Sequence, residues 1–159
     1  MDGQMIPENG PYRDESFHLD GTEPKNGAST AQMALPSKGK LVLSKLPKTW
    51  IFDLDGTLVK HNGYLLDGED SLLPGAKEFL DNLPVEDMIL ILTSRTEEYR
   101  EKTLNYLKSK GIRYDFILFN APMGERVLLN DRKPSGLKTA LAFNLERDSF
   151  YMPELTYEL

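Results

Sequence analysis

The chain has 159 residues, of which 40% are hydrophobic and 28% are charged, so it suits one globular domain with an additional segment. It has no cysteine, which excludes disulfides and zinc–thiolate sites. The formal net charge of -6 argues against nucleic acid as a partner, because no lysine- and arginine-rich stripe is available to displace counterions. No apolar run approaches the length of a membrane span, and the N-terminus lacks a basic and then apolar secretory signal. We therefore expect a cytoplasmic protein without membrane contact.

The first part of the chain has the composition of a flexible leader. Proline, glycine and asparagine interrupt residues 1–38, and the apolar residues there are isolated. Such a segment buries too little apolar surface to offset the entropy cost of ordering. We predict a leader over residues 1–44 and a folded domain with a C-terminal tail over residues 45–159. A short helix near residues 30–35 and a partner-binding role for the leader are alternatives.

The folded part alternates between short apolar runs and helical patterns, which predicts an α/β fold with a parallel sheet. The run at residues 49–54 is continuous and predicts a strand buried on both faces. Helices are expected at 74–83, which Pro74 opens and Pro84 ends, and from Ser94 to about Lys110. Further strands are expected at 41–43, at the sheet edge, and at 88–92, 116–119, 126–129 and 140–145. Glycines flank residues 64–66, which predicts a short hairpin flap.

Two aspartates end the first long strand, in the run Phe52-Asp53-Leu54-Asp55-Gly56-Thr57. The carboxyl ends of strands open onto the ligand crevice of a parallel sheet, and residues two apart share a face of a strand. Asp53 and Asp55 therefore make a good magnesium site. The alternative is an Asp-rich turn held by local hydrogen bonds, without any chemistry.

Polar residues follow two later strands in the same way. Thr93 and Ser94 end the strand at 88–92 and begin a helix, where a phosphate finds outward backbone donors and a favourable dipole. The alternative is a helix N-cap, which is compatible with the first interpretation. Asn130 and Asp131 follow the run at 126–129. Asp131 is either a metal ligand, a salt-bridge partner of Arg132 or a cap of the loop.

These motifs together resemble the haloacid dehalogenase (HAD) superfamily, whose members are mostly magnesium-dependent phosphatases. Asp53 and Asp55 match its motif I, Thr93 and Ser94 its motif II, and Asp131 its motif IV. Residues 45–148 resemble a small bacterial subgroup without a large cap. The resemblance implies a Rossmannoid three-layer sandwich with a central parallel five-stranded sheet, no large cap, and Mg²⁺ held by Asp53, Asp55 and Asp131.

The resemblance also implies the chemistry of a phosphomonoester hydrolase. Asp53 would be the nucleophile and Asp55 the general acid and base, while Thr93, Ser94 and a cation would hold the phosphate. Residues 119–126 contain no lysine to match motif III, so Lys133 is the first candidate for this cation, ahead of Arg126 and Arg95. A small phosphorylated metabolite, such as a sugar phosphate or nucleotide, is the expected substrate.

Three other functions are compatible with the sequence. The missing lysine and Asn130 favour a non-catalytic or weakly active binding module, although such a module has no need for Asp55. An open site could also admit the phosphate at a polynucleotide end. A phosphotransferase is distinguishable only by its products.

Overall fold

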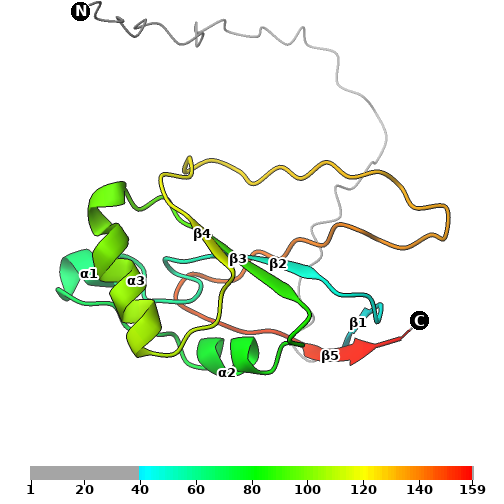
Figure 1. Ribbon diagram of the computed structural model, residues 1–159, viewed down its shortest axis with the longest axis horizontal. Helices are drawn as coiled ribbons and strands as arrows, with labels where there is room; N and C mark the ends of the chain where they lie inside the picture. The colour runs from blue at the N-terminus through cyan, green and yellow to red at the C-terminus, as the bar shows by residue number, and fades with distance from the viewer. Residues whose placement is uncertain (1–39, 159) are drawn as a thin grey trace, which may run out of the picture. The chain divides into compact units, whose positions relative to one another are not determined.

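The computed structural model describes residues 40–158 (Figure 1). The protein has an α/β fold with parallel sheets. The predicted leader, apart from its last residues, lies outside the described residues, and so does the helix suggested near residues 30–35. None of the helices between residues 40 and 158 has the length and apolar character that crossing a bilayer requires.

The central element is a sheet of three parallel strands in the order β2-β3-β4, which confirms the strands predicted at 49–54, 88–92 and 116–119. The strands are β2 (Thr49–Asp53), β3 (Met88–Leu92) and β4 (Phe116–Leu118). Each is rich in aliphatic and aromatic residues that suit a pleated, half-buried surface. Asp53 pairs with Leu92, so the carboxyl ends of β2 and β3 lie side by side.

The helices α2 and α3 lie where the proline and glycine residues at their ends predict them. The elements are α1 (Gly63–Leu66), α2 (Ala76–Asp81), the 3₁₀ helix η1 (Glu97–Tyr99) and α3 (Arg100–Ser109). Helix α2 ends before Pro84, and Gly111 after α3 adopts the left-handed φ of 63° that favours glycine at a helix end. The expected hairpin at residues 64–66 is wrong, because these residues form α1.

A second sheet joins the two ends of the described chain. Strand β1 (Lys40–Leu43) pairs in parallel with β5 (Glu154–Tyr157). The strand at 41–43 was expected, whereas the sequence predicted only an exit segment for the region of β5. Its four residues, of which one is acidic, show no strong periodicity, and the pairing with β1 supplies their backbone partners.

The expected central sheet of five strands is wrong, since the described chain contains sheets of three and two strands. Residues 126–129 and 140–145 form no strand; Figure 1 shows residues 121–149 as a long loop without helix or strand. Val127, Leu128 and Leu129 are exposed. A short apolar run becomes a strand only when a neighbouring strand pairs with its backbone and another element covers its side chains.

Only one face of the three-stranded sheet is covered by other described residues, so the expected three-layer sandwich is not formed in this part of the chain. On the covered face, Phe52, Ile89 and Ile91 are buried in one cluster with residues of α2 and α3. On the opposite face, exposed side chains alternate with these. They are Ile51, Met88, Phe116 and Leu118. The prediction that β2 is buried on both faces is therefore wrong.

Candidate functional site

The turn after β2 separates the two aspartates of motif I. Leu54 is fully buried, and its carbonyl accepts hydrogen bonds from the amides of Leu58 (2.9 Å) and Val59 (3.0 Å). Gly56 adopts a φ of 86°, which a side chain would disfavour, and thereby allows the sharp turn. Asp53 is exposed at the end of β2, whereas the side chain of Asp55 is only 17% exposed. The two carboxylates therefore have different environments.

Several neighbours act on the charge of Asp53. Partial burial raises the pKa of Asp53, and the negative charge of Asp55 raises it further. The Thr57 hydroxyl, which donates to Asp53 Oδ2 at 3.4 Å, and the charge of Arg126 lower this pKa. Asp53 thus lies beside a like charge, a situation that a cation would relieve.

The end of β3 brings Thr93 to the same edge of the sheet as Asp53. Thr93 is buried, and its hydroxyl oxygen accepts a hydrogen bond from the backbone N–H of Arg95 at 3.1 Å. Its backbone N–H donates to Leu118 O (2.9 Å), which ties the turn to β4. Ser94 is half-buried. The phosphate-binding role of Thr93 and Ser94 stays a prediction.

Asp55 is held by an arginine that follows β3. Arg95 donates two hydrogen bonds, from Nε and Nη2, to the two carboxylate oxygens of Asp55, each at 2.8 Å. The same guanidinium binds the buried carboxylate of Asp70 and the hydroxyl of Thr103. The ring of Tyr64 lies 4.0 Å from the guanidinium carbon. From the sequence, Arg95 is predicted only as a phosphate-binding cation, and neither Asp70 nor Tyr64 is identified as a site residue.

No local pattern could have found these contacts. Asp70 lies in a polar stretch before Ser71, where a carboxylate is typical of a solvated surface. Its burial follows from the folding of residues 60–73 against Arg95, which is 25 positions away in the chain. The one signal in the sequence is Arg95 itself, a charged residue three positions after the end of strand β3.

Asp131 and Lys133 lie in the loop of residues 121–149, and both are exposed. Lys133 Nζ donates to the two carboxylate oxygens of Asp131 at 2.9 and 3.0 Å. Between residues 40 and 158, no three histidine, aspartate or glutamate side chains form a group that could hold a metal ion. The structure therefore does not gather Asp53, Asp55 and Asp131 into such a group. The roles predicted for Asp131 and Lys133 stay predictions.

Arg126, at the start of the same loop, is a cation whose charge acts on Asp53. It lowers the pKa of Asp53. Its Nη1 donates to the carbonyl oxygens of Pro122 (2.6 Å) and Gly124 (2.7 Å), which orients the guanidinium. Of the three cations considered for motif III, Arg95 is bound to carboxylates and Lys133 is paired with Asp131.

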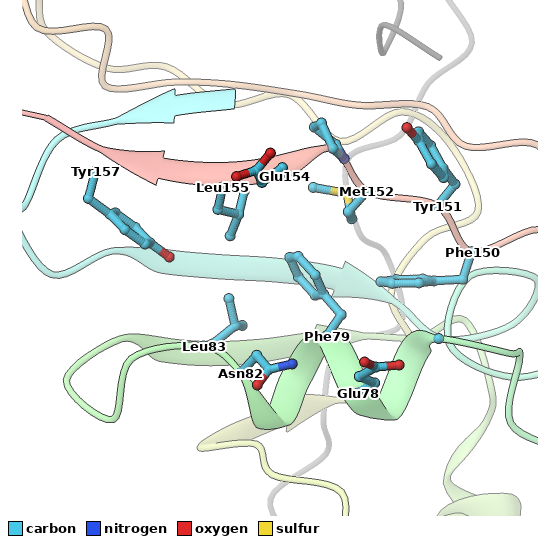
Figure 2. Close-up of a pocket in the computed structure, with 12 residues that line it drawn as sticks. Glu78, Phe79, Asn82, Leu83, Phe150, Tyr151, Met152, Glu154, Leu155 and Tyr157 are labelled. Atoms are coloured by element: carbon cyan, nitrogen blue, oxygen red, sulfur yellow. The ribbon is translucent and has the colours of Figure 1, made fainter. Parts of the chain in front are cut away.

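A groove of about 570 Å³ lies elsewhere in the molecule, between α2 and the segment that leads into β5 (Figure 2). Phe79, Leu83, Phe150 and Leu155 provide apolar lining, and Glu78 and Asn82 provide polar groups. None of the predicted site residues lines this groove. It is therefore distinct from the turn that carries Asp53 and Asp55.

Comparison with known proteins found no matching family model and no matching curated protein. Two solved structures of a Pnkp1/Rnl/Hen1 complex are similar to this chain. The first has 24% identity and a TM-score of 0.43 over 73% of this chain and 40% of the other. The second, described as an RNA repair complex, has 25% identity and a TM-score of 0.41 over 64% and 32%. This chain thus spans less than half of either.

This finding corrects one expectation of the sequence analysis. The acidic composition was taken to argue against nucleic acid as a partner. The similar structures are of an assembly described as an RNA repair complex, which is contrary to that prediction. Net charge describes long-range attraction of the whole chain, whereas a nucleic-acid end can be bound by a few local groups.

Proposed function

We propose that the protein is a phosphomonoester hydrolase of the HAD type, with Asp53 as nucleophile. The observation that carries the proposal is the pair of different carboxylates on the turn after β2. Asp53 is exposed at the carboxyl end of the strand, and Asp55, two residues later, is oriented by a bidentate arginine. A nucleophile and a general acid need such separate environments.

The proposed reaction has two steps. An oxygen of Asp53 attacks phosphorus, the bond from phosphorus to the leaving oxygen breaks, and that oxygen takes a proton from Asp55. Water then attacks the phosphorus of the aspartyl-phosphate and gives a proton to Asp55, while the bond to Asp53 breaks and phosphate leaves. Thr93, Ser94 and a cation would hold the other phosphate oxygens. Arg126, whose charge acts on Asp53, is the better supported candidate for that cation, and Lys133, which is paired with Asp131, is the alternative.

The charges at this site suit Mg²⁺. Asp53 lies beside the like charge of Asp55, and Arg95 is shared between Asp55 and Asp70, so it offsets only one of their negative charges. Asp53 and the backbone carbonyl of Asp55 would hold the ion, which would offset the repulsion between carboxylate and phosphate. Asp131 would be a further ligand of the ion only if the loop of residues 121–149 brings it to the motif I turn.

For the substrate, we favour the phosphate at the end of a polynucleotide over a sugar phosphate or nucleotide. Asp53 is exposed, and only α1 and its flanking loops, residues 60–73, separate the motif I turn from the residues before α2. This segment is too short for a large cap, so a phosphate on a large molecule would find the open approach that it needs.

The test measures phosphate release by the 159-residue chain with Mg²⁺ and with EDTA. The substrates are 3′- and 5′-phosphorylated RNA and DNA oligonucleotides, nucleoside monophosphates and sugar phosphates. We expect magnesium-dependent release, fastest from an oligonucleotide end. The variant Asp53→Asn should lose more than about 10³-fold in kcat, because it lacks the nucleophile.

The matched control is Asp81→Asn, which alters an exposed aspartate that pairs with Lys77 on α2. It should retain wild-type turnover. Undiminished release by pure Asp53→Asn would refute the nucleophile. If only the small metabolites are hydrolysed, the polynucleotide proposal is wrong and a sugar phosphate or nucleotide takes its place. If no phosphomonoester is hydrolysed, the non-catalytic binding module becomes the better interpretation.

A further inference from the structure

The guanidinium of Arg95 has no N–H group left for a substrate. It has five N–H donors, and the structure contains five hydrogen bonds from them. Two go to Asp55, two to Asp70 at 2.8 and 2.6 Å, and one to the hydroxyl of Thr103 at 2.9 Å. The side chain is only 2% exposed, and the Tyr64 ring covers the guanidinium. Arg95 is therefore fully engaged by the protein and cannot clamp a phosphate in this arrangement.

Asp70 holds Arg95 in the interior of the protein. Its side chain is 1% exposed, and both of its carboxylate oxygens accept from Arg95. A buried carboxylate is tolerated only with such a partner. Because the guanidinium is planar and rigid, fixing its contacts to Asp70 and Thr103 also fixes the direction in which Nε and Nη2 donate to Asp55.

The same cluster ties Asp55 to the loop of residues 60–73. The Tyr64 ring packs edge-on against Tyr99, with 4.7 Å between the ring centroids. Lys102 Nζ donates to the carbonyl oxygen of Gly68 at 2.6 Å. Asp70, Tyr64 and Gly68 thus anchor the loop to η1, α3 and Arg95. A displacement of the loop would change the contacts that orient Asp55.

We propose that Arg95 and Asp70 are positioning residues, which hold the Asp55 carboxylate in the orientation for proton transfer and couple it to the loop of residues 60–73. This inference rests on the proposed phosphomonoesterase function. Neither residue touches the reacting atoms; each acts through Asp55. A cluster that only stabilised the fold would instead affect unfolding and leave the turnover of the folded enzyme unchanged.

The test compares Asp70→Asn with Asp67→Asn, measured on the substrate that the wild-type protein hydrolyses with Mg²⁺. The first substitution keeps the shape of the side chain but removes the charge that holds Arg95, whereas Asp67 is an exposed carboxylate of the same loop, paired with Lys60. We expect kcat of the Asp70 variant to fall roughly 10- to 100-fold, with KM within about twofold. The Asp67 variant should keep the wild-type kcat.

Hydrogen–deuterium exchange of the same samples reports on the loop without depending on turnover. Exchange at residues 60–70 should rise in the Asp70 variant and stay unchanged in the Asp67 variant. If Asp70→Asn does not fold by circular dichroism, Thr103→Val, which removes one acceptor of Arg95 and keeps the shape, takes its place. We expect a fall in kcat of about threefold or more for this variant.

The outcomes separate the two proposals. A wild-type protein that hydrolyses no phosphomonoester refutes the proposed function, whatever the variants do. An active wild type whose folded Asp70 or Thr103 variant keeps its kcat overturns the positioning role. A rise in KM at constant kcat also overturns it, because it would indicate contact with the substrate. Unchanged exchange in the loop would overturn the coupling to residues 60–73.

Discussion

At the scale of single residues, Arg126 and Lys133 differ in what their charges act on. Arg126 lowers the pKa of Asp53, while Lys133 binds Asp131 within the exposed loop. We expect Arg126→Ala to lower kcat/KM for phosphate release by about tenfold or more, since it removes a charge that acts on Asp53, the proposed nucleophile. Lys133→Ala should change kcat/KM by less than about twofold, because its charge is already paired in an exposed ion pair. Steady-state kinetics measure both.

The reverse ranking, with a large loss only for Lys133→Ala, would show that Lys133 supplies the motif III charge and that the loop carries it to the site. Arg132→Ala is the control for charge alone, because Arg132 is an exposed neighbour in the same loop. It should leave kcat/KM close to that of the wild type.

Asp87 shows how one buried carboxylate organises the beginning of a strand. It accepts hydrogen bonds from the Lys48 backbone N–H (2.9 Å) and from Trp50 Nε1 (2.8 Å). Asp87→Ala leaves both donors without this acceptor, so we expect the free energy of unfolding to fall by about 3 kcal/mol. Urea denaturation measures the change.

Glu86→Ala is the matched control for Asp87→Ala, because Glu86 is an exposed acidic neighbour. It should change the free energy of unfolding by less than about 0.5 kcal/mol. Equal losses for the two variants would mean that the hydrogen bonds of Asp87 do not stabilise the strand.

At the scale of elements, β3 and the loop of residues 121–149 differ in how their backbones are paired. Strand β3 lies between β2 and β4, so its backbone has partners on both sides. The loop has neither helix nor strand, and the apolar residues 127–129 within it are exposed. We expect amides of β3 to exchange slowest and those of residues 126–129 to exchange within the fastest group, because exchange follows local opening.

Hydrogen–deuterium exchange with peptide-level mass analysis measures this difference. Strands β2 and β4 provide an internal reference, since each has one edge without a strand partner in the described chain. If the amides of residues 126–129 were as well protected from exchange as those of β3, these residues would not form a loop. They would instead form the fourth strand that their apolar composition predicts.

At the scale of the whole molecule, the sheet has one covered and one open face. Ile91 is 0% exposed among residues of α2 and α3, whereas Ile51, on the opposite face, is 50% exposed. We expect Ile91→Ala to lower the free energy of unfolding by about 2–5 kcal/mol, because it leaves a cavity. Ile51→Ala should lower it by less than about 1 kcal/mol, as measured by urea denaturation.

These two variants make the same substitution on opposite faces of the sheet, in the neighbouring strands β2 and β3. A loss for Ile51→Ala comparable to that for Ile91→Ala would mean that a further layer covers the open face. That layer is the one that the resemblance to three-layer sandwich proteins implies. The comparison therefore tests the architecture with a single measurement.

The sequence by itself determined the elements whose signals are local. Strand β3 and helix α2 follow from an apolar run and from the prolines around it. The motif I turn follows from Asp53, Asp55 and Gly56, because the carboxylates cannot continue a buried strand and glycine permits the turn. Candidate chemistry could therefore be assigned to this turn before any contact between distant residues was known.

Only the tertiary structure decided which distant residues meet. The pairing of β1 with β5, the open face of the sheet and the binding of Asp55 and Asp70 by Arg95 join positions far apart in the chain. Residues 126–129 have the composition of a strand but form none in the described chain. Backbone pairing and buried charges are stabilised by neighbours in space, and a local pattern does not contain those neighbours.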